Sequence, residues 1–326
     1  MEVGKVPNDI LKSLILEKIK YTRKEVLLRP KIGEDCCAVD FGEYACVLST
    51  DPITGAVNEI GRLAVHISCN DIASCGVEPI GLLVTILAPP DTTEKDLDTV
   101  MTQICDTASL LNVDILGGHT EITTAVNRFV ITSTAIGRAP NGKIISTAGA
   151  KPGDDIIITK AAGIEGTAII AHDKEDLLIK NFDNRMIDKA KGYVNSISVI
   201  KEGIIAGDFG ASSMHDVTEG GILGAVWEVG EASHVGVVID KDKIPVTEET
   251  KIICEYFEID PLKLISSGCM LITAKNGEEL VQKLNSNGVD AAIIGKVTDT
   301  RDKLLVSKTG TTEILQPESD ELYKVI

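Results

Sequence analysis

The fold of this chain is decided by residues 60–88, IGRLAVHISCNDIASCGVEPIGLLVTILA. The first part of this stretch is apolar over the length of a helix, and Gly76 supplies the left-handed residue that commonly ends one. Residues 81–88 then form a short apolar run that stops at Pro89-Pro90, which predicts a buried strand. The same alternation of helix and strand continues in both directions along the chain, and it indicates an α/β (α+β) fold.

The composition supports this fold class and argues against two classes of partner. Of the 326 residues, 44% are hydrophobic but only 3% are aromatic, so aliphatic side chains and 29 glycines must build the cores. Acidic residues outnumber basic ones by 49 to 32, which gives a formal net charge of -17. Such a chain repels nucleic acid and anionic membrane surfaces. A solubilising role explains most of these charges equally well.

Length and turn residues together predict two domains. A chain of 326 residues commonly forms about two domains of ordinary size. The densest run of turn residues is AGAKPGDD at 148–155, and a new apolar strand follows it directly. We therefore expect an N-terminal domain over residues 1–150 and a C-terminal α/β domain over residues 151–326.

The cysteines and the N-terminus indicate the compartment. No C-x-x-C pair occurs among the eight cysteines, so reduced and mostly buried thiols are the economical interpretation. The sequence from Met1 to Lys20 lacks the apolar core of a signal peptide. No apolar run approaches the ~20 residues that span a bilayer. We therefore expect a soluble, cytoplasmic protein without a membrane partner.

Several acidic residues share one context, because each lies at a strand end, in a glycine-containing turn or in an apolar helix. They are Asp35, Asp51, Asp71, Glu121, Asp216 and Glu219. Magnesium commonly binds through carboxylates plus substrate phosphates, so such residues aimed at one cleft predict a magnesium–nucleotide site. Asp71 carries the most weight, since a carboxylate in an apolar helix needs a cation or several hydrogen-bond donors. Asp51 is equally consistent with capping a turn.

Two glycine pairs and two basic side chains are further candidates. Gly117-Gly118 allows backbone to approach a ligand closely, and Gly220-Gly221 precedes a helix whose free N–H groups suit a phosphate. His119 has the chemistry to orient a substrate, ligate a metal or transfer a proton. Lys5, which follows Gly4, is a candidate phosphate contact. Ordinary turns explain glycine pairs as well, and neither a P-loop nor a clean G-x-G-x-x-G motif is present.

Taken in order, eight segments resemble the AIR synthase (aminoimidazole ribonucleotide synthetase) superfamily. They are GKVPNDIL (4–11), IGEDCCAV (32–39), STD (49–51), NDIASCGVEP (70–79), LGGHTEIT (116–123), GAKPGD (149–154), MHDVTEGG (214–221) and IDPLKLISSG (259–268). Within the superfamily, residues 215–240 are most similar to the HypE family of hydrogenase maturation proteins. The common order of the segments is specific, whereas no single segment is.

The resemblance implies an N-terminal domain whose mixed sheet pairs across a homodimer, with ATP and Mg²⁺ bound near the dimer interface. It places Asp35, Asp51 and Asp71 in the magnesium–phosphate cluster. The expected nucleotide contacts are Lys5, Asn70, Gly117, Gly118, Gly220 and Gly221. The expected catalytic residues are His119, Glu121 and Asp216.

Two departures from the family pattern bear on the reaction. Related proteins carry Gly-Gly-Asp-Thr where this chain has Gly-Gly-His-Thr at 117–120, so one carboxylate is absent and Glu121 is a candidate replacement. HypE proteins end in a cysteine that carries the converted group, whereas this chain ends in ELYKVI and has no cysteine after Cys269. We therefore expect an ATP-dependent enzyme that activates an unidentified small molecule or protein tail. A nucleotide-binding accessory protein and a thiamine-monophosphate kinase are the alternatives.

Overall fold

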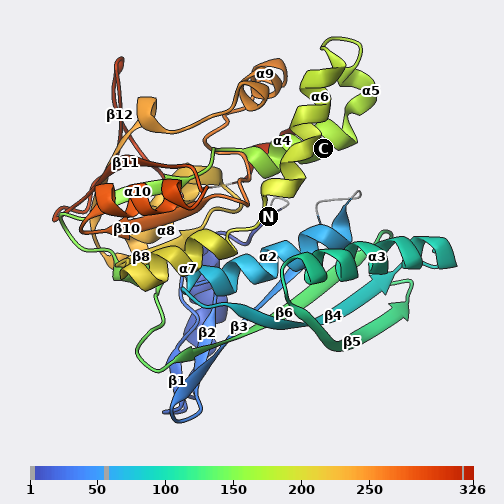
Figure 1. The fold of residues 1–326 in the computed structure, drawn as a ribbon, viewed down its shortest axis with the longest axis horizontal. Helices are drawn as coiled ribbons and strands as arrows, with labels where there is room; N and C mark the ends of the chain where they lie inside the picture. Colours follow the sequence, from blue (N-terminus) through green and yellow to red (C-terminus); the bar gives the residue numbers. More distant parts are fainter. Residues whose placement is uncertain (1–3, 55–58, 318) are drawn as a thin grey trace.

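The computed structural model describes residues 4–54, 59–317 and 319–326, and it confirms two domains that are each built on one mixed sheet (Figure 1). The first sheet has the strand order β1-β2-β3-β6-β4-β5, in which β4 and β5 are parallel and the other neighbours are antiparallel. Its strands are β1 (Val26–Leu28), β2 (Cys37–Asp40), β3 (Tyr44–Ile53), β4 (Pro79–Ala88), β5 (Asp114–Ile122) and β6 (Val130–Pro140).

Helices α2 (Ile60–Ser74) and α3 (Glu94–Leu110) cover one face of the first sheet (Figure 1). Alternate residues of β3, β4 and β6 are buried, as expected for strands that pack one face against helices. No described helix covers the opposite face. Large apolar side chains are exposed on this face, namely Ile80, Leu83 and Leu116.

The second sheet has the strand order β13-β12-β9-β11-β7-β10-β8, and only its β9–β12 pair is parallel among the described strands. Its strands are β7 (Asp155–Thr159), β8 (Ser213–Asp216), β9 (Gly236–Asp240), β10 (Met270–Ala274), β11 (Ala291–Thr298), β12 (Lys303–Ser307) and β13 (Gly310–Glu313). Helices α7 (Ile200–Phe209) and α10 (Gly277–Ser286) pack on one face, and α8 (Gly221–Ser233) packs on the other. The fold class predicted from sequence is confirmed.

Four further helices form a lobe around an apolar cluster of their own. They are α4 (Ile164–Asp173), α5 (Glu175–Leu178), α6 (Asn184–Lys191) and α9 (Glu248–Tyr256). The chain begins with α1 (Asn8–Ile10), which continues as a π-helical turn (Leu11–Ile15) and a 3₁₀ turn (Leu16–Lys18). Among the described residues, no helix combines the length and the apolarity needed to cross a membrane.

Two glycines let helix α7 of the second domain approach helix α2 of the first at backbone contact. A Cβ added at Gly203 would lie 2.3 Å from the carbonyl oxygen of Ala73, and one added at Gly207 would lie 2.9 Å from the Cα of Gly76. Real Cβ atoms do not come this close to backbone, so this helix spacing requires glycine at both positions. Because α2 carries Asp71, the contact fixes where Asp71 lies relative to the second domain.

Strand β5 differs from the turn that Gly117-Gly118 suggested. The strand continues through both glycines, which pair with Leu83 and Val84 of β4 just after a shift in register. Gly118 has a φ of +154°, and a Cβ at this position would lie 1.7 Å from the carbonyl oxygen of Val84. The glycine therefore permits a close approach between two strands at an irregularity of the sheet.

Replacing Gly203 with alanine should destabilise the protein, because the added methyl group meets the Ala73 carbonyl and pushes α7 from α2. Overpacking of this kind typically costs about 1–3 kcal/mol. We expect the thermal midpoint of Gly203→Ala to fall by several degrees. The matched control is Gly192→Ala, whose added Cβ would meet nothing within 4 Å. Equal midpoints for the two variants would contradict the inferred helix contact.

Candidate functional site

Four aspartates from both domains meet where the domains join. Asp35 lies in the loop before β2, Asp51 lies near the end of β3, Asp71 lies within α2, and Asp216 is the last residue of β8. Burial is the largest cause that raises the pKa of the Asp71 carboxyl well above its ordinary value, and Asp216, Asp51 and Asp35 raise it further. The structure thus places the three aspartates of the expected magnesium cluster together with Asp216, which the sequence suggested as a catalytic residue.

Asp216 has the most unusual environment of the four. It is fully buried, and neither of its carboxylate oxygens has a hydrogen-bond partner among the described residues. Burial, followed by the charge of Asp35, raises its pKa to about 8. Buried polar atoms nearly always have partners in native proteins, so two orphaned oxygens indicate a group that the polypeptide does not supply. A hard divalent cation such as Mg²⁺ prefers such oxygens. The carboxylate oxygens of Asp35 and Asp216 lie within 4.8 Å of each other, so these two residues fit a shared metal ion.

His215 connects the two domains beneath this cluster. Its Nδ1 lies 2.7 Å from Oδ2 of Asp35, and its Nε2 lies 2.9 Å from Oε2 of Glu228 on α8. Burial by itself lowers the pKa of the His215 imidazole, but the two carboxylates outweigh this effect and raise the pKa well above its ordinary value. His215 is therefore an imidazolium that donates both N–H groups. Although its ring lies within reach of the Asp35 and Asp216 oxygens, neither nitrogen is left to bind a metal.

The N-terminal segment adds a positive charge beside the carboxylates. The Lys5 Nζ donates to Oγ1 of Thr218 at 3.2 Å, and the Lys5 backbone N–H donates to Oε2 of Glu219 at 3.1 Å. The Tyr323 hydroxyl donates to the other oxygen of Glu219 at 3.0 Å. The surrounding protein acts to lower the pKa of the Lys5 ammonium by desolvation, but nearby carboxylates led by Glu228 outweigh it and raise this pKa. Lys5, a candidate phosphate contact, thus lies beside the carboxylates of the site.

A cavity of about 840 Å³ lies between the domains, and we refer to it as the interdomain pocket. Lys5 and Asp51 of the acidic site belong to its lining, and aliphatic side chains from both domains form much of its wall. Arg128 and Lys174 also line it, and neither forms an ion pair with any residue that the structure describes. The volume lies within the range of roughly 300–1,000 Å³ that is usual for small-molecule sites.

Three of the expected nucleotide contacts are bonded to other parts of the protein. The Asn70 side chain donates to the Ile197 carbonyl at 2.8 Å, and its Oδ1 accepts from the Val199 N–H at 2.9 Å. The N–H of Gly220 donates to Oδ2 of Asp320 at 2.7 Å. The N–H of Gly221 donates to the Thr218 carbonyl at 3.1 Å. The structure therefore gives the N–H groups of the glycine pair protein acceptors, and Asn70 ties α2 to the second domain.

The remaining candidates lie away from the carboxylates, on the edge strand β5. Asp51 is aligned through Ser133 of β6 and Val84 of β4 with Gly118 of β5. Three strand spacings of about 4.8 Å separate the ends of this row by roughly 14 Å. His119 and Glu121 are paired with Thr85 and Leu87, so they project from the uncovered face of the sheet. Their side chains are exposed and lie 3.4 Å apart (His119 Nε2 to Glu121 Oε2).

Sequence reasoning did not select two residues that hold the site together. Neither His215 nor Glu228 is among the site residues expected from the sequence. Glu228 did carry a usable signal, because it interrupts an apolar helix in the same way as Asp71. The pairing of His215 with Asp35 has no such signal, since the two residues are 180 positions apart in the chain.

Comparison with known proteins finds relatives that match most of the chain. A putative hydrogenase expression/formation protein of Methanocaldococcus jannaschii is 27% identical over 332 residues, which cover 99% of this chain and 97% of the relative. The carbamoyl dehydratase HypE of Rhizobium leguminosarum is 27% identical over 82% of this chain and 77% of the relative. A thiamine-monophosphate kinase of Pyrococcus horikoshii is 28% identical over 82% of this chain and 83% of the relative.

Solved structures share the fold over most of the chain. A crystal structure of a HypE–HypF complex matches with a TM-score of 0.78 at 23% identity, covering 94% of this chain and 99% of the matched one. A structure of HypE in complex with ATP matches with a TM-score of 0.70 at 22% identity, covering 100% and 98%. Among family sequence models, the N-terminal domain of AIR synthase related protein matches residues 33–139 and its C-terminal domain matches residues 151–307. The chain therefore belongs to the AIR synthase related protein family.

Proposed function

We propose that this protein is an ATP- and Mg²⁺-dependent enzyme of the HypE type, which activates a small substrate by phosphoryl transfer. The observation that carries the proposal is the pair of orphaned Asp216 oxygens within a cluster of four aspartates beside a ligand-sized pocket. Two kinds of relative support it, since one is named a carbamoyl dehydratase and the other a kinase. The structure of a HypE bound to ATP, which has the same fold, supports ATP as the nucleotide.

The residues of the site divide into two roles under this proposal. Asp35, Asp51, Asp71 and Asp216 would hold Mg²⁺, while Lys5 would contact the phosphates. When bound, Mg²⁺ and ATP supply charge neutralisation and a transferable phosphoryl group. The His215 imidazolium keeps Asp35 in place and offsets part of the repulsion among the carboxylates. The pocket wall excludes water from one side of the site and orients the acceptor.

Thiamine-monophosphate kinase is a second candidate, because one relative at 28% identity carries that name. The two candidates are separated by their products. Formation of thiamine diphosphate from the monophosphate and ATP would favour the kinase, whereas its absence would exclude it. Stabilisation by ATP without turnover of any tested substrate would instead indicate an accessory nucleotide-binding protein.

We also propose that the chain forms a homodimer through the uncovered face of the first sheet. This face exposes Ile80, Leu83 and Leu116, and exposed apolar patches commonly mark interaction sites. His119 and Glu121 of the edge strand β5 project from the same face. A second copy packed on this face would bury these side chains.

Replacing Asp71 with asparagine should abolish Mg²⁺-dependent ATP turnover while keeping the fold. Asparagine retains an oxygen that accepts the hydrogen bond from the Ser49 hydroxyl, but it removes the charge that binds the cation. Even outer-shell partners of metal ligands change activity by about 10–100-fold, so a loss of more than about 100-fold is expected here. Circular dichroism and steady-state ATP hydrolysis measure the two effects. Near-normal turnover would remove Asp71 from the metal site.

The metal site should also make stability depend on pH. Asp216 has a pKa of about 8 in the folded protein against an ordinary value of 3.8, so between these values only the folded state holds the proton. Without metal, this group's contribution to the free energy of unfolding therefore falls as the pH rises from about 4 to about 8. Mg²⁺ takes the place of the proton, so it should raise the thermal midpoint more at pH 8 than at pH 6.

The variant Asp216→Asn tests this explanation of the pH dependence. The control is Asp299→Asn, which changes an exposed aspartate. Asp216→Asn should lose less stability than the parent between pH 6 and pH 8 in the absence of metal, and it should lose the response to Mg²⁺. Asp299→Asn should behave like the parent. A full Mg²⁺ response in Asp216→Asn, measured by differential scanning fluorimetry, would contradict the assignment.

Placing a charge on the uncovered face should produce monomers. Leu83 is 43% exposed in the single chain, and a glutamate at this position would be desolvated in the dimer without a partner. We expect Leu83→Glu to elute as a monomer in size-exclusion chromatography with light scattering, with an unchanged circular dichroism spectrum. The control Leu110→Glu changes a leucine that is 77% exposed at the end of α3, and it should remain dimeric. A monomeric parent protein would refute the dimer.

A further inference from the structure

Two buried polar groups lie in the wall of the interdomain pocket next to aliphatic side chains, on a side that His172 also lines. Glu165 and Ser267 both line the pocket, and they are 4% and 0% exposed, respectively. The surrounding wall is formed by Leu63 and Ile67 of α2 together with Ile169 of α4. Neither polar residue belongs to the aspartate cluster. A buried carboxyl beside a buried hydroxyl in such a wall needs a physical explanation.

Glu165 is bonded to the loop that carries Ser267. Its Oε2 accepts a hydrogen bond from the Ser267 backbone N–H at 3.1 Å, and the nearby Ser267 side chain also acts to lower the pKa of the carboxyl. Burial is the main cause that raises the pKa of this carboxyl to about 7, and the charges of Asp320 and Glu219 raise it further. At neutral pH a large fraction of Glu165 is therefore protonated. In that form the carboxyl group both donates and accepts hydrogen bonds.

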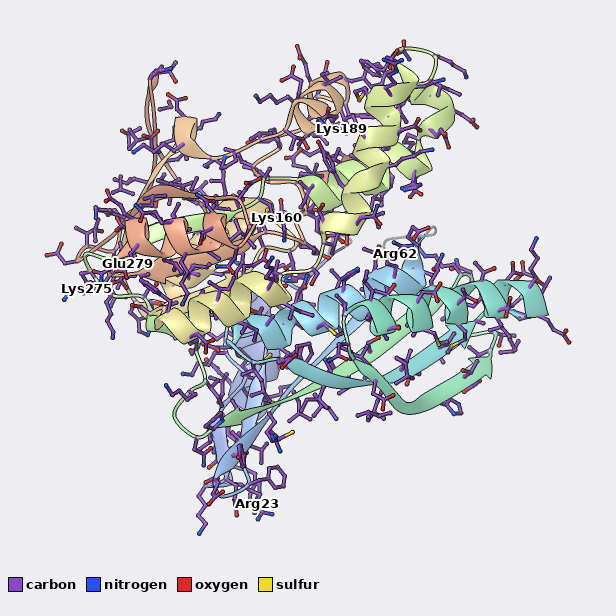
Figure 2. All side chains as sticks on the ribbon, viewed as in Figure 1. Arg23, Arg62, Lys160, Lys189, Lys275 and Glu279 are labelled. Carbon is purple, nitrogen blue, oxygen red and sulfur yellow. The ribbon has the colours of Figure 1, made fainter. Side chains whose placement is uncertain are left out.

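Ser267 is held in place although its own hydroxyl is unused. The Ser267 Oγ is buried and has no partner among the described residues. On one side of it, the Ser266 hydroxyl accepts from the Gly163 N–H at 2.6 Å. On the other side, the Lys160 ammonium donates to the Gly268 carbonyl at 2.8 Å, from a position beside the start of α7 (Figure 2). The loop is thus fixed at both flanking residues, and it presents an unpaired hydroxyl at the pocket wall.

An unpaired buried hydroxyl lowers the stability of a protein, so Ser267 Oγ does not stabilise this fold by itself. A ligand that reaches both groups would satisfy them together. We take the matching ligand group to be neutral, because Glu165 and Ser267 offer no positive charge that would pair with an anion at this point of the wall. It must also donate and accept, as a hydroxyl or a primary amide does. The aliphatic wall suits a short hydrocarbon portion next to that group.

We infer that Glu165 and Ser267 bind a neutral hydroxyl or primary amide group of the acceptor substrate, whose short aliphatic portion packs against Leu63, Ile67 and Ile169. This inference rests on the proposed function, since it assigns the interdomain pocket to the acceptor rather than to the nucleotide. Both residues are then substrate contacts. They determine which substrate is accepted and leave the binding of ATP to the aspartate cluster.

The experiment measures binding of three matched probes to the full-length protein: butyramide, 1-butanol and butyrate. Dissociation constants come from the shifts of the Ile67 and Ile169 methyl resonances in methyl-labelled protein at pH 6, where Glu165 is protonated. We expect butyramide or 1-butanol to bind more tightly than butyrate, and the better of the two neutral probes identifies the functional group. Ser267→Ala should reduce the affinity for that probe roughly fivefold, which corresponds to one lost hydrogen bond.

Two further variants separate ligand binding from structure. Ser267→Ala removes only an unpaired hydroxyl, so its thermal midpoint should equal or exceed that of the parent. Ser266→Ala removes a hydroxyl that is bonded to Gly163 and Leu264, so it should lower the midpoint without the fivefold loss of affinity. Glu165→Gln keeps a side chain that donates and accepts hydrogen bonds, so this variant should still bind the neutral probe. Unchanged affinity in Ser267→Ala, stronger binding of butyrate, or no methyl shift with either neutral probe would overturn the inference.

Thermal stabilisation by ATP and Mg²⁺ is measured in the same preparations, so that the two proposals can fail separately. If the parent protein and Ser267→Ala are stabilised equally by ATP and Mg²⁺ while the probe results are negative, only the acceptor contact is wrong. If neither protein responds to ATP and Mg²⁺, the proposed function is wrong whatever the probes show.

Discussion

The hydrogen-bonded ion cluster of Asp35, His215 and Glu228 is the constraint on which the rest of the site depends. Asp35 belongs to the first domain, whereas His215 and Glu228 belong to the second. The imidazolium is 2% exposed in its side chain, and both of its N–H groups are bonded to carboxylates. A buried charge is tolerated when it is paired and hydrogen-bonded, and this one also connects two domains. Loss of the His215 imidazolium would leave the partly buried carboxylates of Asp35 and Glu228 without their shared partner.

The cost of gathering four aspartates is offset by packing elsewhere at the domain junction. Ile67 and Leu63 of α2 form an apolar cluster with Ala168, Val194 and Ile197 of the second domain. The close approach of α7 to α2 adds a second contact. The distance between the two helices can hardly change there, because backbone packs directly against backbone. These contacts hold the aspartates at a spacing that their charges alone would oppose. Functional sites commonly combine such unfavourable electrostatics with a rigid surrounding structure.

The sequence predicted the features that follow from local pattern. Asp71 stood out because it interrupts an apolar helix, and the structure places it in the cluster. The polar stretch 172–191, in contrast, was not predicted to contain helices, although it holds α5 and α6. Those helices bury only one narrow side, so their sequences read as mostly charged. His215 could not have been recognised by pattern, because its partner Asp35 reaches it only through the packing of two domains.

Sheet order explains why neighbours in the sequence motifs do not become neighbours in the site. His119 and Glu121 follow a glycine pair that the family resemblance places beside the aspartates, yet β6 and β4 lie between β3 and β5. The pleat adds a second separation, since both side chains project from the face opposite to α2 and α3. A side chain cannot pass through a sheet, so His119 does not reach the cluster of its own chain. The order of the strands and the pleat of the sheet together therefore separate His119 from the chemistry that the aspartates of its own chain support.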